Sequence, residues 1–314
     1  MSTEIIERIF TVAGSASLKV ANIAGQVTIR PGQDGVIQVT ATKHIGKGDP
    51  EKTKVEIEQA EDGSVQVKTH YESIGWARHI RPCIVDYDIQ VPVQCSVKAS
   101  NVSSNLSAHG LEGTFYLKSV SGIMELQQLS GEMELSSVSG KIKASELRGD
   151  LKFESVSGKV DIQASNIPTV YGKSVSGDFK LESPLGTGPY EFKSVSGRVT
   201  LIVPGDTRAT LSQHGISGAV KTNLPVTSRT RGQGRELVEV QNGGTTIALN
   251  SVSGVVRLLS PDAPEDTLES EPVSESQTAQ STPEKPAALS QMEILEAIER
   301  GELSVADALQ KMNA

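Results

Sequence analysis

The 314-residue sequence has few cysteines and few aromatic residues. It contains two cysteines, Cys83 and Cys95, and its aromatic content is 4%. Two cysteines are too few for a disulfide framework, so we expect two buried free thiols. Hydrophobic residues make up 37% of the chain, which is low for one large globular core. A thin core of Val, Ile, Leu and Ala would need fewer bulky residues and fits this composition.

The sequence also lacks a basic excess and a long apolar run. Lys and Arg number 30 against 38 Asp and Glu, a net charge of −8, which argues against nucleic-acid binding and against adsorption to an anionic membrane. No apolar segment approaches the roughly 18–20 residues of a transmembrane helix. Residues 1–8 show no basic segment leading into an apolar stretch, as a secretory signal requires. We therefore expect a cytoplasmic protein with no membrane span, and leave open a peripheral association with the cell envelope.

What the sequence does contain is a short repeat. Between Gly113 and Gly158 a glycine recurs every nine residues, and Gly254 follows Gly218 by 36 residues, which is four such units. The tetrapeptide Ser-Val-Ser-Gly occurs six times, at 119–122, 137–140, 155–158, 174–177, 194–197 and 251–254.

Apolar and polar residues alternate within each unit. Counted from the Val or Leu two residues before the glycine, positions 1, 5 and 7 are apolar, position 3 is Gly, and positions 2, 4, 6 and 8 are mostly polar. This period of two predicts a strand with one buried face. The alternation breaks at positions 8 and 9, so the chain must bend there, where a serine hydroxyl can bond to turn backbone groups. The glycine would permit a tight corner or a close approach of the next coil.

One strand and one bend every nine residues predict an all-β fold, a β-solenoid with coils of about 18 residues. Stacked coils would pair through parallel backbone hydrogen bonds about 4.8 Å apart, and each coil would bury its apolar row against its neighbours. The alternative is an antiparallel meander folded into a sandwich. Asn-Gly or Asp-Gly hairpin turns would favour the meander, and the nine-residue units contain neither.

Three other segments flank the repeat, which we place at 99–260. Residues 1–98 alternate less regularly, and we expect them to start and cap the solenoid. Residues 261–289 are rich in Pro, Ser and Glu, which predicts a disordered acidic linker. Residues 290–314 predict a short helical hairpin, with Gly301 ending the first helix. Because helices this short are marginal alone, we expect them to dock on a protein partner, which is a second copy, the solenoid or another protein.

Several features together resemble a known bacterial family. They are the alternating segment 18–29, the strand 85–92 that ends at a proline, and the Ser-Val-Ser-Gly series. Over residues 10–260 they resemble the bacterial putative adhesin domains, also named domain of unknown function 4097. The resemblance implies a right-handed β-helix-like fold, no established catalysis and, for several relatives, a link with the cell envelope and its stress responses. Residues 294–309 resemble the short helical SHOCT-like segments that accompany such domains.

The sequence marks no catalytic, cofactor or metal site. Calcium-binding β-rolls share the period, but they need Asp ligands in a Gly-Gly-x-Gly-x-Asp motif, whereas acidic residues such as Glu125 here lie on the wet face. The five histidines lack zinc-ligand spacing, and no Gly-x-Ser-x-Gly elbow occurs. Parallel β-helices also carry carbohydrate-active enzymes, which need paired carboxylates, and no pair stands out. We expect a non-enzymatic, adhesin-like structural or binding scaffold and keep a carbohydrate-active β-helix enzyme as the alternative.

The loop 74–82 is the most unusual local feature. It holds the only tryptophan, Trp76, together with Arg78, His79 and Arg81. Two interpretations stay open, since this loop would either pack Trp76 over the solenoid end as a cap or form a binding hot spot, for which Trp and Arg are typical.

Overall fold

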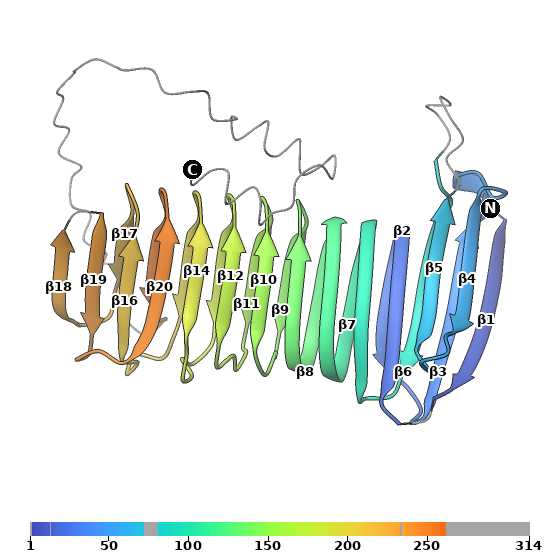
Figure 1. Cartoon of the computed structure of the whole chain (residues 1–314), viewed down its shortest axis with the longest axis horizontal. Helices are drawn as coiled ribbons and strands as arrows, with labels where there is room; N and C mark the ends of the chain where they lie inside the picture. The colour runs from blue at the N-terminus through green and yellow to red at the C-terminus, as the bar shows by residue number, and fades with distance from the viewer. Residues whose placement is uncertain (1, 13, 72–80, 233, 262–314) are drawn as a thin grey trace, which may run out of the picture.

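The protein is an elongated stack of β-strands (Figure 1). The computed structural model describes residues 2–12, 14–71, 81–232 and 234–261. Within them, 21 strands join in one hydrogen-bonded sheet, and the described helical structure is a single 3-10 turn, η1 (Ile45–Lys47). The predicted all-β, solenoid-like architecture is therefore confirmed. The linker beyond Pro261, the helical hairpin at 290–314 with its SHOCT-like segment, and Trp76 lie outside the described residues.

The strands form two layers, and three long strands turn a corner to contribute to both: β2 (Ala16–Pro31), β7 (Cys95–Ser121) and β8 (Ile123–Ser137). Layer A otherwise contains β4 (Thr53–Gln59), β5 (Val65–Tyr71), β10 (Leu151–Ser155), β12 (Val170–Ser174), β14 (Tyr190–Ser194), β16 (Ala209–His214), β18 (Val226–Gly232), β19 (Arg235–Val240) and β20 (Thr245–Ser251). Layer B contains β1 (Thr3–Thr11), β3 (Val36–His44), β6 (Ile84–Val91), β9 (Lys141–Ser145), β11 (Lys159–Gln163), β13 (Asp178–Glu182), β15 (Arg198–Ile202), β17 (Ala219–Thr222) and β21 (Val255–Leu259).

Parallel pairing between successive coils sets the register. Leu151 lies beside Met133 in layer A, and Val160 lies beside Ile142 in layer B, so each step is 18 residues. This confirms the predicted coil length and shows that the antiparallel meander was the wrong alternative for the repeat. Later coils are slightly longer, because Val170 pairs with Leu151 after 19 residues.

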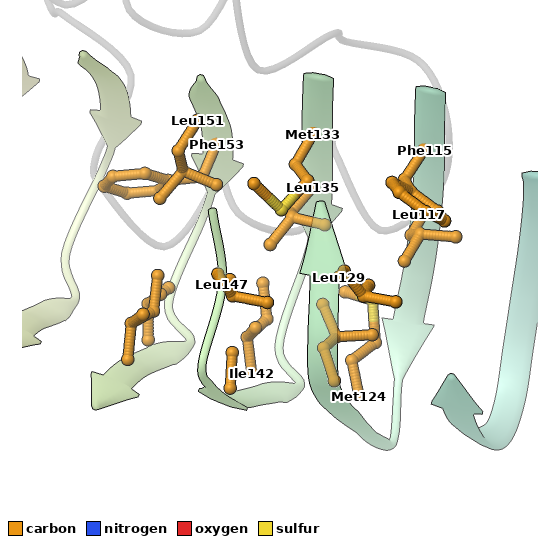
Figure 2. Packing of buried hydrophobic residues seen from close by; sticks show 14 of the residues in the cluster. Phe115, Leu117, Met124, Leu129, Met133, Leu135, Ile142, Leu147, Leu151 and Phe153 are labelled. Atoms are coloured by element: carbon orange, nitrogen blue, oxygen red, sulfur yellow. The ribbon is translucent and has the colours of Figure 1, made fainter. Parts of the chain in front are cut away.

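Positions 5 and 7 of the units form the core between the layers (Figure 2). Met124, Met133, Leu135 and Ile142 are at most 2% exposed. Position 1 is less uniform than the alternation predicts. The leucines of one corner, such as Leu129 and Leu147, are fully buried, whereas Val120 of the Ser-Val-Ser-Gly corner is 41% exposed.

The Ser-Val-Ser-Gly corner explains why these residue types recur. The N–H of Gly140 donates to the hydroxyl of Ser137 at 3.0 Å, which satisfies a backbone group that the bend removes from the sheet. A Cβ on Gly140 would overlap the carbonyl oxygen of Gly122 in the preceding coil. The corner therefore requires glycine for close stacking and serine for its hydrogen bond, as the sequence predicts.

The order of the coils in space differs from their order in the sequence. β20 lies between β14 and β16, since Ile247 pairs with Tyr190 on one side and with Leu211 on the other. In layer B, β21 lies between β15 and β17 in the same way. The last coil is thus inserted into the stack (Figure 1), and the 36-residue interval from Gly218 to Gly254 does not represent successive coils.

Antiparallel strands bound the parallel stack at both ends. At the C-terminal end, β19 pairs antiparallel with β16 and with β18. At the N-terminal end, β4 pairs antiparallel with β5 in layer A, and β1, β3 and β6 pair antiparallel in layer B. The parallel strands therefore meet antiparallel strands at the N-terminal end in both layers and at the C-terminal end in layer A, whereas the parallel strand β17 ends layer B.

Candidate functional site

A groove on the outer side of layer A is the candidate binding site. Its volume is about 470 Å³, and it crosses five neighbouring strands of the sheet, from β7 to β14. Outward-facing side chains line it: Thr114, Tyr116, Glu132, Glu134, Asp150, Lys152, Thr169, Tyr171, Pro189 and Glu191.

The coil register brings these side chains together. Tyr116, Glu134, Lys152 and Tyr171 lie side by side on successive strands and form one row across the groove. Because neighbouring strands are about 4.8 Å apart, the two tyrosines lie roughly 14 Å from each other. A ligand that contacts both rings must therefore be extended.

The groove carries more negative than positive charge. Four of its lining residues are acidic, and Lys152 is the single basic one. Lys152 Nζ lies 3.2 Å from Glu134 Oε2, and the hydroxyl of Thr169 donates to Asp150 Oδ1 at 2.5 Å. One of the acidic side chains is therefore paired with a cation, and the net charge of the groove remains negative.

The two tyrosine rings differ in their surroundings. Tyr116 is 44% exposed, which leaves much of its ring open to a ligand. Tyr171 has the ammonium groups of Lys173 and Lys193 near its ring, at 5.5 and 5.9 Å from the centroid. Both distances lie within cation–π range, so Tyr171 already has two cations beside its ring and Tyr116 is the ring more open to a ligand.

A second groove of similar volume, about 470 Å³, lies on the outer side of layer B. Its lining is mostly polar, with His109, Gln127 and Lys141 among the residues, and the described residues that line it include no Tyr, Phe or Trp. Lys143 and Glu125 pair across it at 3.3 Å. Layer B thus has a groove of the same volume as the layer A groove but without tyrosines, and it can serve as a control surface.

The histidines and cysteines occupy other places. His44 Nε2 lies 2.7 Å from Asp86, and His70 Nε2 lies 3.0 Å from Glu56. In the part of the chain that the structure describes, no three His, Cys, Asp or Glu residues gather in a way that could hold a metal ion. Cys83 and Cys95 are buried free thiols, as predicted, and burial raises the pKa of Cys95 to about 12.

The sequence did not point to the layer A groove. The prediction placed any specific site at the loop that contains Trp76 or at the helices of 290–314, both of which lie outside the described residues. The available signal was a tyrosine at an outward position in two units, Tyr116 and Tyr171. The sequence analysis assigned no role to either tyrosine.

None of the helical structure within the described ranges has the length and hydropathy of a transmembrane span. A comparison with curated proteins gives no match.

Several crystal structures are similar to this chain. A putative adhesin from Bacteroides fragilis is 12% identical, with 82% of this chain and 97% of that chain covered and a TM-score of 0.45. A putative adhesin from Parabacteroides merdae is 12% identical, with 81% and 96% covered and a TM-score of 0.40. A putative lipid binding protein from Parabacteroides distasonis is 11% identical, with 81% and 96% covered and a TM-score of 0.40.

A family model described as Toastrack DUF4097 matches residues 16–259. The match includes nearly all of the described strands and well over half of the 314 residues. The chain therefore belongs to the Toastrack DUF4097 family.

Proposed function

We propose that this protein is a non-catalytic, adhesin-like binding scaffold whose layer A groove holds an extended basic segment of a protein partner. The observation that carries the proposal is the row from Tyr116 to Tyr171, in which two rings lie three strands apart in a groove with an acidic lining. A rigid, repetitive sheet can hold such a row in place without a loop rearrangement.

The chemistry of the lining favours a basic ligand. Lysine or arginine side chains would lie over the ring of Tyr116 by cation–π attraction, which contributes about 0.5–1 kcal/mol at exposed sites. Glu132 and Glu191 would pair with further basic residues along the segment. The layer A side chains would also steer a basic ligand toward the groove, and this effect weakens as salt increases.

The same side chains support binding over hydrolysis. A glycosidase needs one carboxylic acid in an apolar pocket that keeps it protonated. Glu134 instead faces Lys152 at 3.2 Å, and both side chains are partly exposed to solvent. The carbohydrate-active alternative therefore gains no support from the groove.

The C-terminal segment would add a docking element to this scaffold. The helices at 290–314 would dock on a protein partner and be joined to the stack by the acidic linker. We propose a cytoplasmic location with peripheral association at the cell envelope. Pull-downs that compare the full chain with a chain ending at residue 260 would test the docking, and equal sets of partners would contradict it.

Binding to the groove can be tested with short labelled peptides and fluorescence anisotropy. We expect a Lys-rich extended peptide to bind and a Glu-rich peptide of equal length not to bind. Tyr116→Ala should weaken binding about three- to tenfold, the factor that corresponds to about 1 kcal/mol. Gln127→Ala in the layer B groove is the matched control and should leave the affinity unchanged. Equal affinity of the wild-type protein for both peptides, or an unchanged affinity of Tyr116→Ala, would contradict the proposal.

A further inference from the structure

The free edge of β1 lies at the N-terminal end of the stack (Figure 1). Among the described strands, β1 pairs with β3 alone. The carbonyl of Ser2 accepts the N–H of Ile45 at 3.1 Å, and the N–H of Val12 donates to Gly35 at 2.9 Å. Even-numbered residues therefore direct their backbone groups toward β3. Because these directions alternate along a strand, the odd-numbered residues from Thr3 to Thr11 direct theirs outward.

This edge is long and partly apolar. Ile5 and Ile9 are 62% and 68% exposed on one side of β1. On the other side, Ile6 and Phe10 are only partly buried against the core. A nine-residue edge with unpaired backbone groups and four apolar side chains is a template for another strand.

Side-chain contacts mark two edge strands at the C-terminal end. Arg229 and Arg231 of β18 reach the carboxylate of Glu236 on β19. β17 has four residues, and the N–H and the carbonyl of Val220 already bond to Glu236 and Arg229. Such features are how proteins block edge-to-edge association. β4 also has a single strand partner among the described strands, β5, and spans seven residues. With nine residues β1 is the longest of these edges, and Arg8 bonds one of its outward groups, the carbonyl of Glu7, at 2.8 Å.

We propose that β1 pairs antiparallel with β1 of a second copy of this chain across a two-fold axis. Glu4, Ile6 and Arg8 lie on the same side of β1, because residues two apart share a face. In the register that places Ile6 opposite Ile6 of the second copy, Glu4 lies opposite Arg8 of the second copy, and the same pair forms again across the axis. This charge complementarity identifies a second copy as the occupant of the edge.

The neighbouring symmetric registers are less favourable. Moving the two-fold axis one residue toward the C-terminus places Glu7 opposite Glu7, and the next position places Arg8 opposite Arg8, and like charges directly opposite destabilise a strand pair. Moving the axis one residue toward the N-terminus places Ile5 opposite Ile5, which loses both Glu4–Arg8 pairs. In the proposed register, Thr3, Ile5, Glu7 and Ile9 exchange about eight backbone hydrogen bonds with the second copy. In the single chain the Arg8 guanidinium donates to the carbonyl of Glu7 at 2.8 Å, and Glu4 Oε2 lies 3.4 Å from Lys43 Nζ. In the dimer the Glu4–Arg8 pairs would replace the first contact and share Glu4 with Lys43.

The dimer would be closed and elongated. Both β1 edges are used by a two-fold contact, so the assembly stops at two copies. The two stacks would join end to end, which leaves the layer A groove of each copy away from the contact. The proposal is therefore independent of the proposed ligand.

The oligomeric state of the full chain tests the proposal, measured by sedimentation velocity over a range of concentrations. We expect a dimer for the wild-type protein and a monomer for Glu7→Pro. Proline at this position removes an N–H that faces the free edge and leaves the bonds to β3 intact. Glu7→Ala is the matched control, keeps the N–H and should remain a dimer.

A charge exchange tests the register. Glu4→Arg and Arg8→Glu should each raise the dissociation constant about tenfold or more, because each places like charges opposite one another twice. An equimolar mixture of the two variants should recover the wild-type dissociation constant. A wild-type monomer at all concentrations, a Glu7→Pro dimer, or a mixture that associates no better than the single variants would overturn the proposal.

Discussion

The edge strands at the two ends of the stack differ in the side chains that lie along them. At the C-terminal end, side chains of the β18–β19 hairpin occupy the backbone groups of the last strand in layer B, through Glu236 and Arg229. At the N-terminal end, β1 has β3 as its single partner among the described strands, Arg8 bonds the outward carbonyl of Glu7, and Ile5 and Ile9 are exposed. A stack of parallel strands has two edges in each layer, and each must be covered, charged or paired. In layer B the C-terminal edge is thus covered by side chains of the chain itself, whereas the N-terminal edge is the interface proposed above.

Removing Glu236 at the C-terminal end should cause the largest loss in the free energy of unfolding. Its carboxylate is 2% exposed, accepts the N–H of Val220 at 3.1 Å and lies 3.1 Å from Arg231. Glu236→Ala leaves a buried donor and two arginines without their acceptor, so we expect a loss of about 2–4 kcal/mol in the free energy of unfolding. Urea denaturation measures it. Glu236→Gln keeps an acceptor oxygen and should lose less, and equal losses for both variants would contradict this role.

A polar network inside the N-terminal end should have an intermediate effect. The hydroxyl groups of Tyr87 and Thr69 lie 2.6 Å apart, and Thr69 also bonds to Asn22 at 3.1 Å. Tyr87→Phe removes one partner, and we expect a loss of about 1–2 kcal/mol in the free energy of unfolding. A loss as large as that of Glu236→Ala would show that the N-terminal end depends on buried polar contacts as much as the C-terminal end does.

The same network predicts a dependence on alkaline pH. Burial raises the pKa of Tyr87 to about 12, against about 10 for the unfolded chain. Between these values the unfolded state releases a proton that the folded state keeps, so stability falls as the pH rises above 10. Thermal unfolding from pH 9 to 11 should show a smaller decrease for Tyr87→Phe than for the wild-type protein. An identical decrease would contradict the contribution of Tyr87.

The smallest effect is expected at the turn between β4 and β5. Hydrogen bonds from the hydroxyl and the N–H of Ser64, together with Lys19, lower the pKa of Asp62. A lowered pKa stabilises the folded state above the unfolded pKa of about 4, and this contribution is lost as the pH falls below that value. Asp62→Asn should therefore flatten the thermal stability profile between pH 5 and pH 2. Lys19→Gln, which leaves the Ser64 bonds in place, should flatten it less.

The core of the repeat could be predicted from the sequence in detail. The alternation identified Met124, Leu135 and Ile142 as inward residues, and all are buried. The corner also followed from residue chemistry, since serine and glycine have the roles expected of them at Ser137 and Gly140. The position of Val120 could not be predicted, because alternation specifies the face of a strand and not how far a corner extends into solvent.

The groove could not be predicted for a related reason. The alternation of the repeat places Tyr116 on the outer face, but it does not place Tyr171 in the same row. Tyr116 and Lys152 are two coils of 18 residues apart, whereas Tyr171 follows Lys152 by 19 because the corner between them holds one extra residue. A constant period therefore places Tyr171 on the wrong face.

By itself the sequence determined the nine-residue strand and bend, the two layers and the residues between them, because these depend on contacts within a coil and with any similar neighbour. The tertiary structure alone decided which coils are neighbours. The Ser-Val-Ser-Gly unit at 251–254 is inserted beside β14 and β15, although β16 to β19 precede it in the sequence. Backbone hydrogen bonds of parallel strands are the same for every pair of coils, so the repeat cannot encode this order. In the structure β19 pairs with one side of β16, and the last coil pairs with its other side, between β16 and β14.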